Sequence, residues 1–201
     1  MRPIIISLAV LLLLSCSSFA ANSSRKALIS LCDPAKIDTL TSDRAANPRV
    51  RKIAYWLEIA RQEGRDPRAE MDAVMGHLGW GGTLKGELTA AAMVRNRTIA
   101  DRLGCLGGTG MAKLRRGASP IVTLGPYAGD KLVVDHIIPR SKCPSLDNVL
   151  ANLELMPATL NRRKSDKVGQ RQLDLAKKLV RAGLLSEGEV EILSHARRGD
   201  G

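Results

Sequence analysis

The spacing of apolar residues changes after Pro120, and this change constrains the fold more than any other feature of the chain. Upstream, as in residues 53–60, apolar side chains recur at helical spacing with Glu and Arg among and beside them. Downstream, residues 121–124 and 132–138 are short, β-branched apolar runs of the kind that form strands, and Gly125-Pro126 separates them as a turn. Because helical spacing then resumes, the sequence predicts an α+β fold that is mostly helical.

Local signals predict helices first, then strand, loop, strand and helix, then helices again. Proline at the first helical position supports helix starts at Asn47-Pro48 and Asp66-Pro67, and Ser186 with Glu189 fits a capping box. The glycines of residues 107–110 are expected to form a flexible joint. The expected helices are 47–64, 66–78, 83–103, 157–167, 170–182 and 186–197, and residues 152–156 are expected to be extended.

The chain is strongly basic, with 31 Lys and Arg against 20 Asp and Glu and a net charge of +11. Such an excess attracts polyanions, so charge alone indicates either nucleic acid or an anionic membrane or cell envelope. An apolar content of 44% excludes wholesale disorder. Only 2% of residues are aromatic, which argues against a platform that stacks single-stranded bases.

Three short segments after residue 134 carry the side chains that phosphodiester hydrolysis requires. Asp135 and Asn161 offer hard oxygen ligands for a divalent cation, which neutralises the charge developing on the phosphate. His136 is the natural base for removing a proton from water at neutral pH. A nearby amide such as Asn152 could hold the imidazole in one tautomer and orientation. The sequence therefore predicts a metal-assisted hydrolytic site.

Cationic side chains near these segments are expected to bind flanking phosphates. Asn161 and Lys164 are three residues apart on an expected helix, so both can face one groove. Asp135 and His136 would point to opposite faces of an ideal strand, so they can share a site only if the strand twists or ends there, as Pro139 favours. The expected nucleic-acid-binding residues are Arg140, Arg163, Lys164 and Lys167.

These motifs resemble the signature of the HNH (ββα-metal) endonuclease family in its final-Asn form. The matching residues are Asp-His-Ile-Ile-Pro at 135–139, Asn-Leu-x-Leu at 152–155 and Asn-x-x-Lys at 161–164. The resemblance covers residues 120–168. It implies a ββα-metal module flanked by N-terminal and C-terminal helices. The implied roles are His136 as general base, Asp135 and Asn161 as metal ligands, and Asn152 as the middle structural Asn, with Asn148 as a rival whose spacing fits worse.

One divalent metal ion and no small-molecule cofactor are expected. Mg²⁺ is the first choice, although a site with a single histidine could accept Mn²⁺, Ni²⁺ or Zn²⁺. Many relatives carry paired Cys-x-x-Cys motifs that bind structural zinc, and this chain has none. A disulfide bond through Cys143 could take the place of that structural zinc site.

The first residues are expected to direct export. Arg2 precedes an apolar run over residues 4–14, and small residues follow. Cleavage after Ala20 would release a periplasmic or secreted chain without a stable transmembrane segment, whereas the Leu-Leu-Ser-Cys motif ending at Cys16 resembles a lipobox that would leave a lipoprotein. Export would place the remaining cysteines in an oxidising compartment, where one bridge is possible in any of three pairings. These cysteines are Cys32, Cys105 and Cys143.

The sequence therefore divides into a signal peptide (1–20), a helical N-terminal region (21–119), the HNH module (120–168) and C-terminal helices (169–201). The expected function is a metal-dependent endonuclease that acts on DNA. The main alternative is a secreted basic protein that binds nucleic acid and whose HNH core is catalytically inactive. A third, weaker option is an envelope protein that its charge docks to anionic surfaces.

Overall fold

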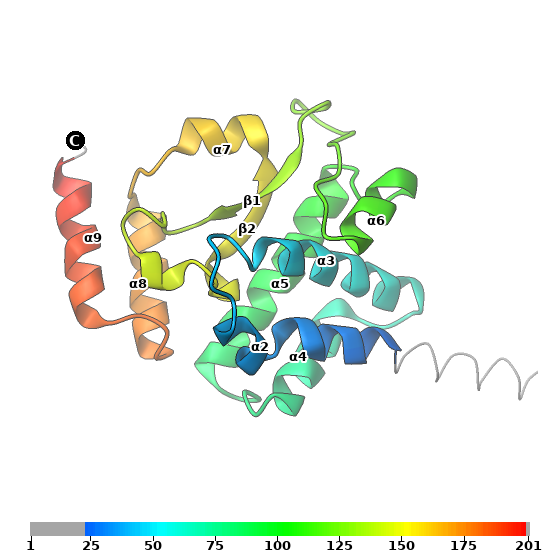
Figure 1. Cartoon of the computed structure of the whole chain (residues 1–201), viewed down its shortest axis with the longest axis horizontal. Helices are drawn as coiled ribbons and strands as arrows, with labels where there is room; N and C mark the ends of the chain where they lie inside the picture. Colours follow the sequence, from blue (N-terminus) through cyan, green and yellow to red (C-terminus); the bar gives the residue numbers. More distant parts are fainter. Residues whose placement is uncertain (1–22, 200–201) are drawn as a thin grey trace, which may run out of the picture.

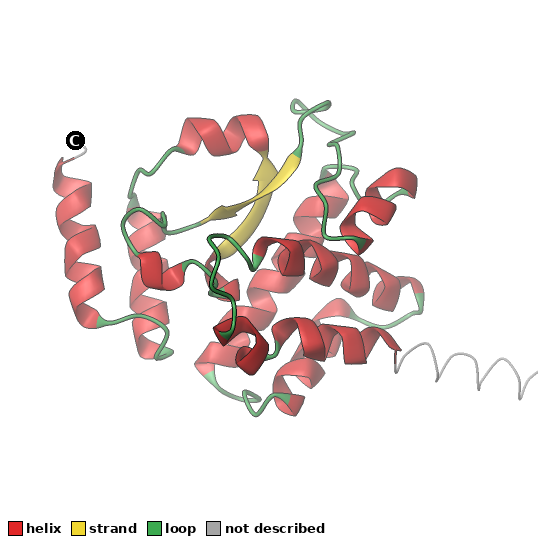
Figure 2. Ribbon diagram, in the orientation of Figure 1, coloured by secondary structure: helices red, strands yellow, loops and turns green. Residues whose placement is uncertain are grey.

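A computed structural model describes residues 23–199, which are built mainly from helices around one pair of strands (Figures 1 and 2). The expected signal peptide and Cys16 lie outside the described residues. Residues 23–32 are helical, and the later helices are α2 (Pro34–Asp38), α3 (Asn47–Gln62), α4 (Pro67–His77), α5 (Leu84–Arg102), α6 (Gly108–Arg115), α7 (Ala158–Lys164), α8 (Gln170–Arg181) and α9 (Glu187–Gly199).

The two strands, β1 (Leu132–His136) and β2 (Leu153–Pro157), pair antiparallel, with His136 opposite Leu153 at the end of β1. The long connection between them contains two 3₁₀ turns, η1 (Pro144–Leu146) and η2 (Leu150–Asn152). Helix α7 follows β2 directly, so the order is strand, loop, strand and helix (Figure 1). The expected mostly helical α+β fold is confirmed at this level.

The helices begin where local capping chemistry predicts. Asp66 accepts a hydrogen bond from the Ala69 amide at the start of α4, and Thr83 does the same for the Gly86 amide of α5. At α9, the Ser186 amide donates to the Glu189 carboxylate, which completes the expected capping box. Short-range side-chain acceptors therefore set these boundaries.

Three local predictions are wrong. Residues 121–124 form no strand, since only Ile121 makes a bridge, to Lys131, and the Thr123 and Leu124 amides instead donate to the Leu103 carbonyl at the end of α5. The expected glycine joint is part of α6. There a Cβ on Gly110 would lie 2.3 Å from the Cys105 carbonyl oxygen, so glycine serves close packing. Pro157 ends β2 and is the N-cap of α7, so the helix begins one residue later than expected.

The hydrophobic core is shared between segments that are far apart in the sequence. One cluster joins α3, α4 and α5 to both strands, with Leu57, Met93 and Leu153 among its fully buried members. A second cluster packs the loop between the strands against α8 and α9, around Leu146 and Leu179. The N-terminal region and the two strands therefore fold around one core, and the end of β1 is held in place by both.

The cysteines do not form the expected disulfide bond. Within residues 23–199, Cys32, Cys105 and Cys143 are all free and buried, with Cys143 in a different core cluster from the other two. Burial raises the pKa of Cys32 to about 12 and that of Cys105 and Cys143 to about 11, so each is a protonated, apolar core side chain. None of the helices in this part of the chain is long and apolar enough to cross a membrane.

Candidate active site

A cavity of about 830 Å³ opens where β1 ends beside α7. Asp135, His136 and Asn161, which belong to two separate segments, all line it. The sequence places these three side chains in one site, and the structure brings them to one cavity. Their neighbours there include Arg140 and Lys164 from the expected phosphate-binding set.

Asp135 and His136 share the cavity because β1 ends at His136. Burial alternates along the strand, so His136 is only 5% exposed while Asp135 is half-buried. The chain then turns through Pro139, which also lines the cavity. The end of β1 therefore allows Asp135 and His136 to line the same cavity.

The imidazole of His136 is held by Asp147. Its Nε2 atom lies 3.0 Å from the Asp147 carbonyl oxygen, to which it hydrogen-bonds, and 3.0 Å from the carboxylate Oδ1. The carbonyl oxygen can only accept, so Nε2 donates to it, and in the neutral imidazole the lone pair is on Nδ1. The contact that we expected from Asn152 is therefore made by Asp147, a residue that the sequence analysis missed because only the path of the loop brings it to His136.

Asn152 instead fixes the turn that follows His136. It is fully buried, and its Oδ1 accepts from the Ile138 amide (2.8 Å) while its Nδ2 donates to the Ile138 carbonyl (3.1 Å). The Asn152 carbonyl also accepts from the Ile137 amide at 2.8 Å. Asn148, the rival, accepts from the Ala46 amide and so ties the loop to the N-terminal region. Asn152 thus acts on the backbone next to the site.

Lys164 is committed to contacts inside the site. Its Nζ donates to Asp135 Oδ2 at 2.7 Å and to the His136 carbonyl at 2.7 Å, and it is largely buried. These two bonds join α7 to the end of β1. We expected Lys164 to bind phosphate, and the structure shows that its ammonium group positions Asp135.

The donors expected to hold a metal ion fit a hard divalent cation. Asp135 has a second carboxylate oxygen beside the one that Lys164 contacts, and the Asn161 side-chain amide has no hydrogen bond within the described residues. In that part of the chain no three His, Cys, Asp or Glu side chains gather as a metal site. One carboxylate and one amide suit Mg²⁺, which keeps several waters and takes other ligands from substrate phosphates.

The remaining cationic residues divide into two groups. Arg140 lines the cavity and pairs with Asp43 at 2.5 Å, whereas Arg163 and Lys167 are exposed and do not line it. Four of the lining residues that the sequence analysis missed carry a cationic or amide side chain, and three of these belong to α3 or the loop before it, where no local motif marks them. They are Arg44, Asn47, Arg51 and Arg162.

No protein-family model matches the chain, and no curated protein or solved structure matches it significantly.

Proposed function

We propose that this protein is a metal-dependent endonuclease of the HNH (ββα-metal) type that hydrolyses phosphodiester bonds in DNA. The observation that carries the proposal is one cavity lined by the Asp135 carboxylate, the His136 imidazole and the Asn161 amide. The excess of basic residues supports a polyanionic substrate. With the predicted signal peptide, the enzyme would act after export, in the periplasm or outside the cell.

In this proposal His136 is the general base. Because Nε2–H is engaged by Asp147, Nδ1 is the nitrogen that accepts a proton from the attacking water. The Asp147 carboxylate, 3.0 Å from Nε2, then stabilises the imidazolium that forms. Asn152 contributes indirectly, because it holds the backbone immediately after His136.

Asp135 and Asn161 would hold the divalent cation. When bound, such an ion neutralises the negative charge that develops on the phosphate and on the leaving oxygen. Lys164 donates to one oxygen of the Asp135 carboxylate and so fixes the orientation of the whole group. The second carboxylate oxygen is the one left for the cation. Asp135 and Asn161 project from β1 and α7, so the core that joins these elements also sets the spacing of the ligands.

Nicking of supercoiled plasmid by the mature chain tests the proposal. We expect cleavage with Mg²⁺, Mn²⁺, Ni²⁺ or Zn²⁺ that EDTA abolishes, and a loss of about 10³-fold in His136→Ala while DNA binding persists. His77→Ala is the matched control, because His77 is exposed at the end of α4 and outside the cavity.

The alternative is a basic protein that binds nucleic acid without cutting it. One observation favours it: the Lys164 ammonium already neutralises Asp135 across 2.7 Å, which weakens the case for a second cation there. Wild-type protein that binds plasmid but never nicks it with any of the four metals would establish this alternative.

A further inference from the structure

One wall of the cavity comes from outside the strand-loop-strand-helix unit. Asn47 and Arg51 lie on consecutive turns of α3, and Arg44 lies in the loop before it. All three line the same cavity as Asp135 and His136. The N-terminal region therefore supplies part of the site's surface, including two guanidinium groups.

Arg51 has no counter-charge among the described residues, unlike the half-buried Arg65 and Arg97. Its Nη1 donates to the Gly117 carbonyl at 3.1 Å, while its buried Nε has no partner and no carboxylate lies within ion-pair distance among the described residues. Arg65 and Arg97, by contrast, each contact a glutamate. Burial lowers the pKa of Arg51, so the surroundings disfavour its charge until an anion arrives.

The neighbouring Asn47 is left unsatisfied as well. Its Oδ1 atom is buried and has no hydrogen-bond partner among the described residues. Orphaned buried polar atoms are rare, and here two occur one helical turn apart on the same cavity wall. Protein contacts therefore leave hydrogen-bonding capacity unused at this wall of the cavity.

Arg44 is anchored to the same group that holds the imidazole. Its backbone amide donates to Asp147 Oδ2 at 3.0 Å, while the other oxygen of that carboxylate lies 3.0 Å from His136 Nε2. Arg44 has a positive φ of 57°, a conformation that non-glycine residues rarely adopt. The loop before α3 is thus held against the His136 side of the cavity.

We infer that α3 forms a phosphate-binding wall, in which Arg51, assisted by Arg44, holds a backbone phosphate of the nucleic acid beside Asp135 and His136. This inference rests on the proposed function, since it names the groups that seat the substrate of that site. It also assigns a substrate-binding role to the N-terminal region. Arg51 lines the cavity and has no carboxylate partner among the described residues, so its guanidinium has charge and donors that a phosphate oxygen can use.

Arg49 provides a matched control for Arg51. It lies on the same helix and also donates through Nη1 to backbone carbonyls, those of Ser30 and Leu31, but it does not line the cavity. Arg49→Met and Arg51→Met therefore remove the same charge and the same kind of side-chain-to-backbone hydrogen bond.

The experiment measures binding of a labelled 20-base-pair DNA duplex by fluorescence anisotropy, in EDTA and in a His136→Ala background, at several salt concentrations. We expect Arg51→Met to weaken binding by about 10-fold and to reduce the slope of log K against log salt by about 1. Arg49→Met should change affinity less than about threefold. Equal effects of the two variants on affinity and slope would overturn the inference.

Asn47→Asp is a second variant that does not depend on removing Arg51. An acidic residue at the first turn of α3 is compatible with the helix, and its charge would neutralise Arg51 or repel the phosphate. We expect weaker DNA binding with an unchanged melting temperature, and unchanged binding would contradict the inference. Binding is measured without cleavage, so the two proposals can fail separately. If no metal supports nicking, only the nuclease proposal is refuted. If the protein nicks DNA but Arg51→Met and Arg49→Met weaken binding equally, only the phosphate-binding wall is refuted.

Discussion

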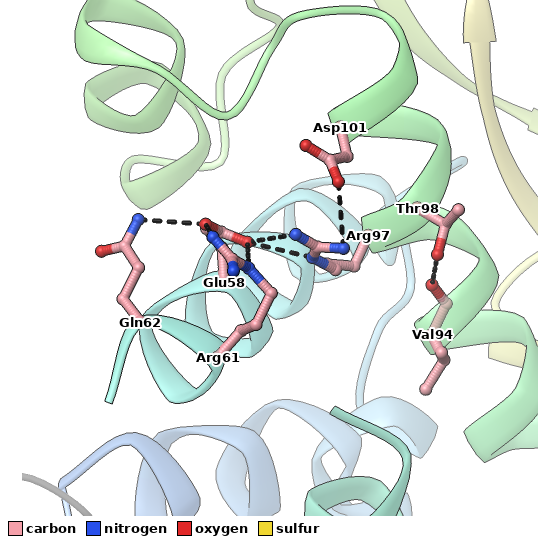
Figure 3. Close-up of polar contacts among 7 residues, drawn as sticks. All are labelled: Glu58, Arg61, Gln62, Val94, Arg97, Thr98 and Asp101. Carbon is pink, nitrogen blue, oxygen red and sulfur yellow. Dashed lines mark hydrogen bonds and ion pairs between the residues drawn. The ribbon is translucent and has the colours of Figure 1, made fainter. Parts of the chain in front are cut away.

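The two halves of α3 carry charged clusters that differ in one respect. In the C-terminal half, the Glu58 carboxylate is 2% exposed and accepts hydrogen bonds from Arg61, Gln62 and Arg97, at distances from 2.6 to 3.0 Å (Figure 3). In the N-terminal half, Arg51 and Asn47 each keep a buried polar atom without a partner in the described chain. The hydrogen-bonding capacity of the Glu58 cluster is therefore satisfied within the protein, whereas that of Arg51 and Asn47 is not.

The Glu58 cluster explains how α3 and α5 are joined. Arg97 comes from α5 and also contacts Asp101, so Glu58 connects the two helices (Figure 3). Burial raises the pKa of Glu58, but the hydrogen bonds from its three partners outweigh burial and hold the pKa below its usual value. Because the Glu58 carboxylate is fully engaged by these partners, the cluster stabilises the fold and offers no free group to a ligand. The comparison therefore separates structural charge from binding charge on one helix.

The largest expected effect is on stability, in Glu58→Gln. Removing the charge leaves Arg97 and Arg61 facing a neutral amide, which should lower the free energy of unfolding by about 3 kcal/mol at pH 7, while DNA affinity stays unchanged. Chemical denaturation measures the first and anisotropy the second. Asp72→Asn, which breaks an exposed pair with Arg68, should cost under about 0.5 kcal/mol. A loss of DNA binding without a loss of stability would break the comparison.

The pH dependence of the Glu58 contribution has a definite sign. Its pKa is lower in the folded state, so the stabilisation is complete above the ordinary value near 4.5 and is lost as the pH falls through the folded value. Wild type should therefore lose stability in acid more steeply than Glu58→Gln. Parallel curves for the two proteins below pH 4.5 would contradict this explanation.

Asn152→Ala should have the next largest effect and should act on both stability and catalysis. The change leaves the Ile138 amide and carbonyl unpaired in the interior, at a cost of about 2 kcal/mol. It also loosens the backbone after His136, so the nicking rate should fall even where the protein is fully folded. Asn148→Ala removes one comparable bond, from the Ala46 amide, and a longer one of 3.5 Å to the Leu40 carbonyl, both at a more exposed position, and should cost about half as much.

Asp147→Asn should affect the rate more than the fold. The backbone carbonyl that accepts from His136 Nε2 remains, but the carboxylate that stabilises imidazolium is lost, so we expect kcat to fall by about 10-fold with little change in melting temperature. Asp43→Asn is the control, because Asp43 is 74% exposed and contacts only Arg140 among the described residues. If both variants nick at the wild-type rate, Asp147 has no positioning role.

The smallest expected effect is that of Arg163→Ala. Arg163 is exposed outside the cavity, so its contact with a flanking phosphate should contribute about threefold to DNA affinity, less than Arg51 does. Arg181→Ala, on the exposed surface of α8, removes the same charge and should change affinity by less than about twofold. An Arg163 effect that exceeds the Arg51 effect would place the substrate on the outer face of α7.

Much of the local structure followed from the sequence. Asp66, Thr83 and the Ser186–Glu189 pair predict helix starts because capping depends on residues only two or three positions away. The strand predicted for residues 121–124 does not form. Their β-branched side chains suit a strand, but two of their backbone amides donate to the Leu103 carbonyl at the end of α5. Helix packing overrode intrinsic preference there.

The sequence by itself determined which of the proposed catalytic groups can meet: the Asp135 carboxylate, the His136 imidazole and the Asn161 amide stand at spacings that a strand end and a helix can bring to one cavity. Only the tertiary structure decided that Asp147 holds the imidazole, that Lys164 is turned inward, and that α3 closes one wall. The reason is that these contacts join segments brought together by a shared core. The packing of whole helices decides which residues meet in these contacts, and no sequence pattern within a few residues predicts it.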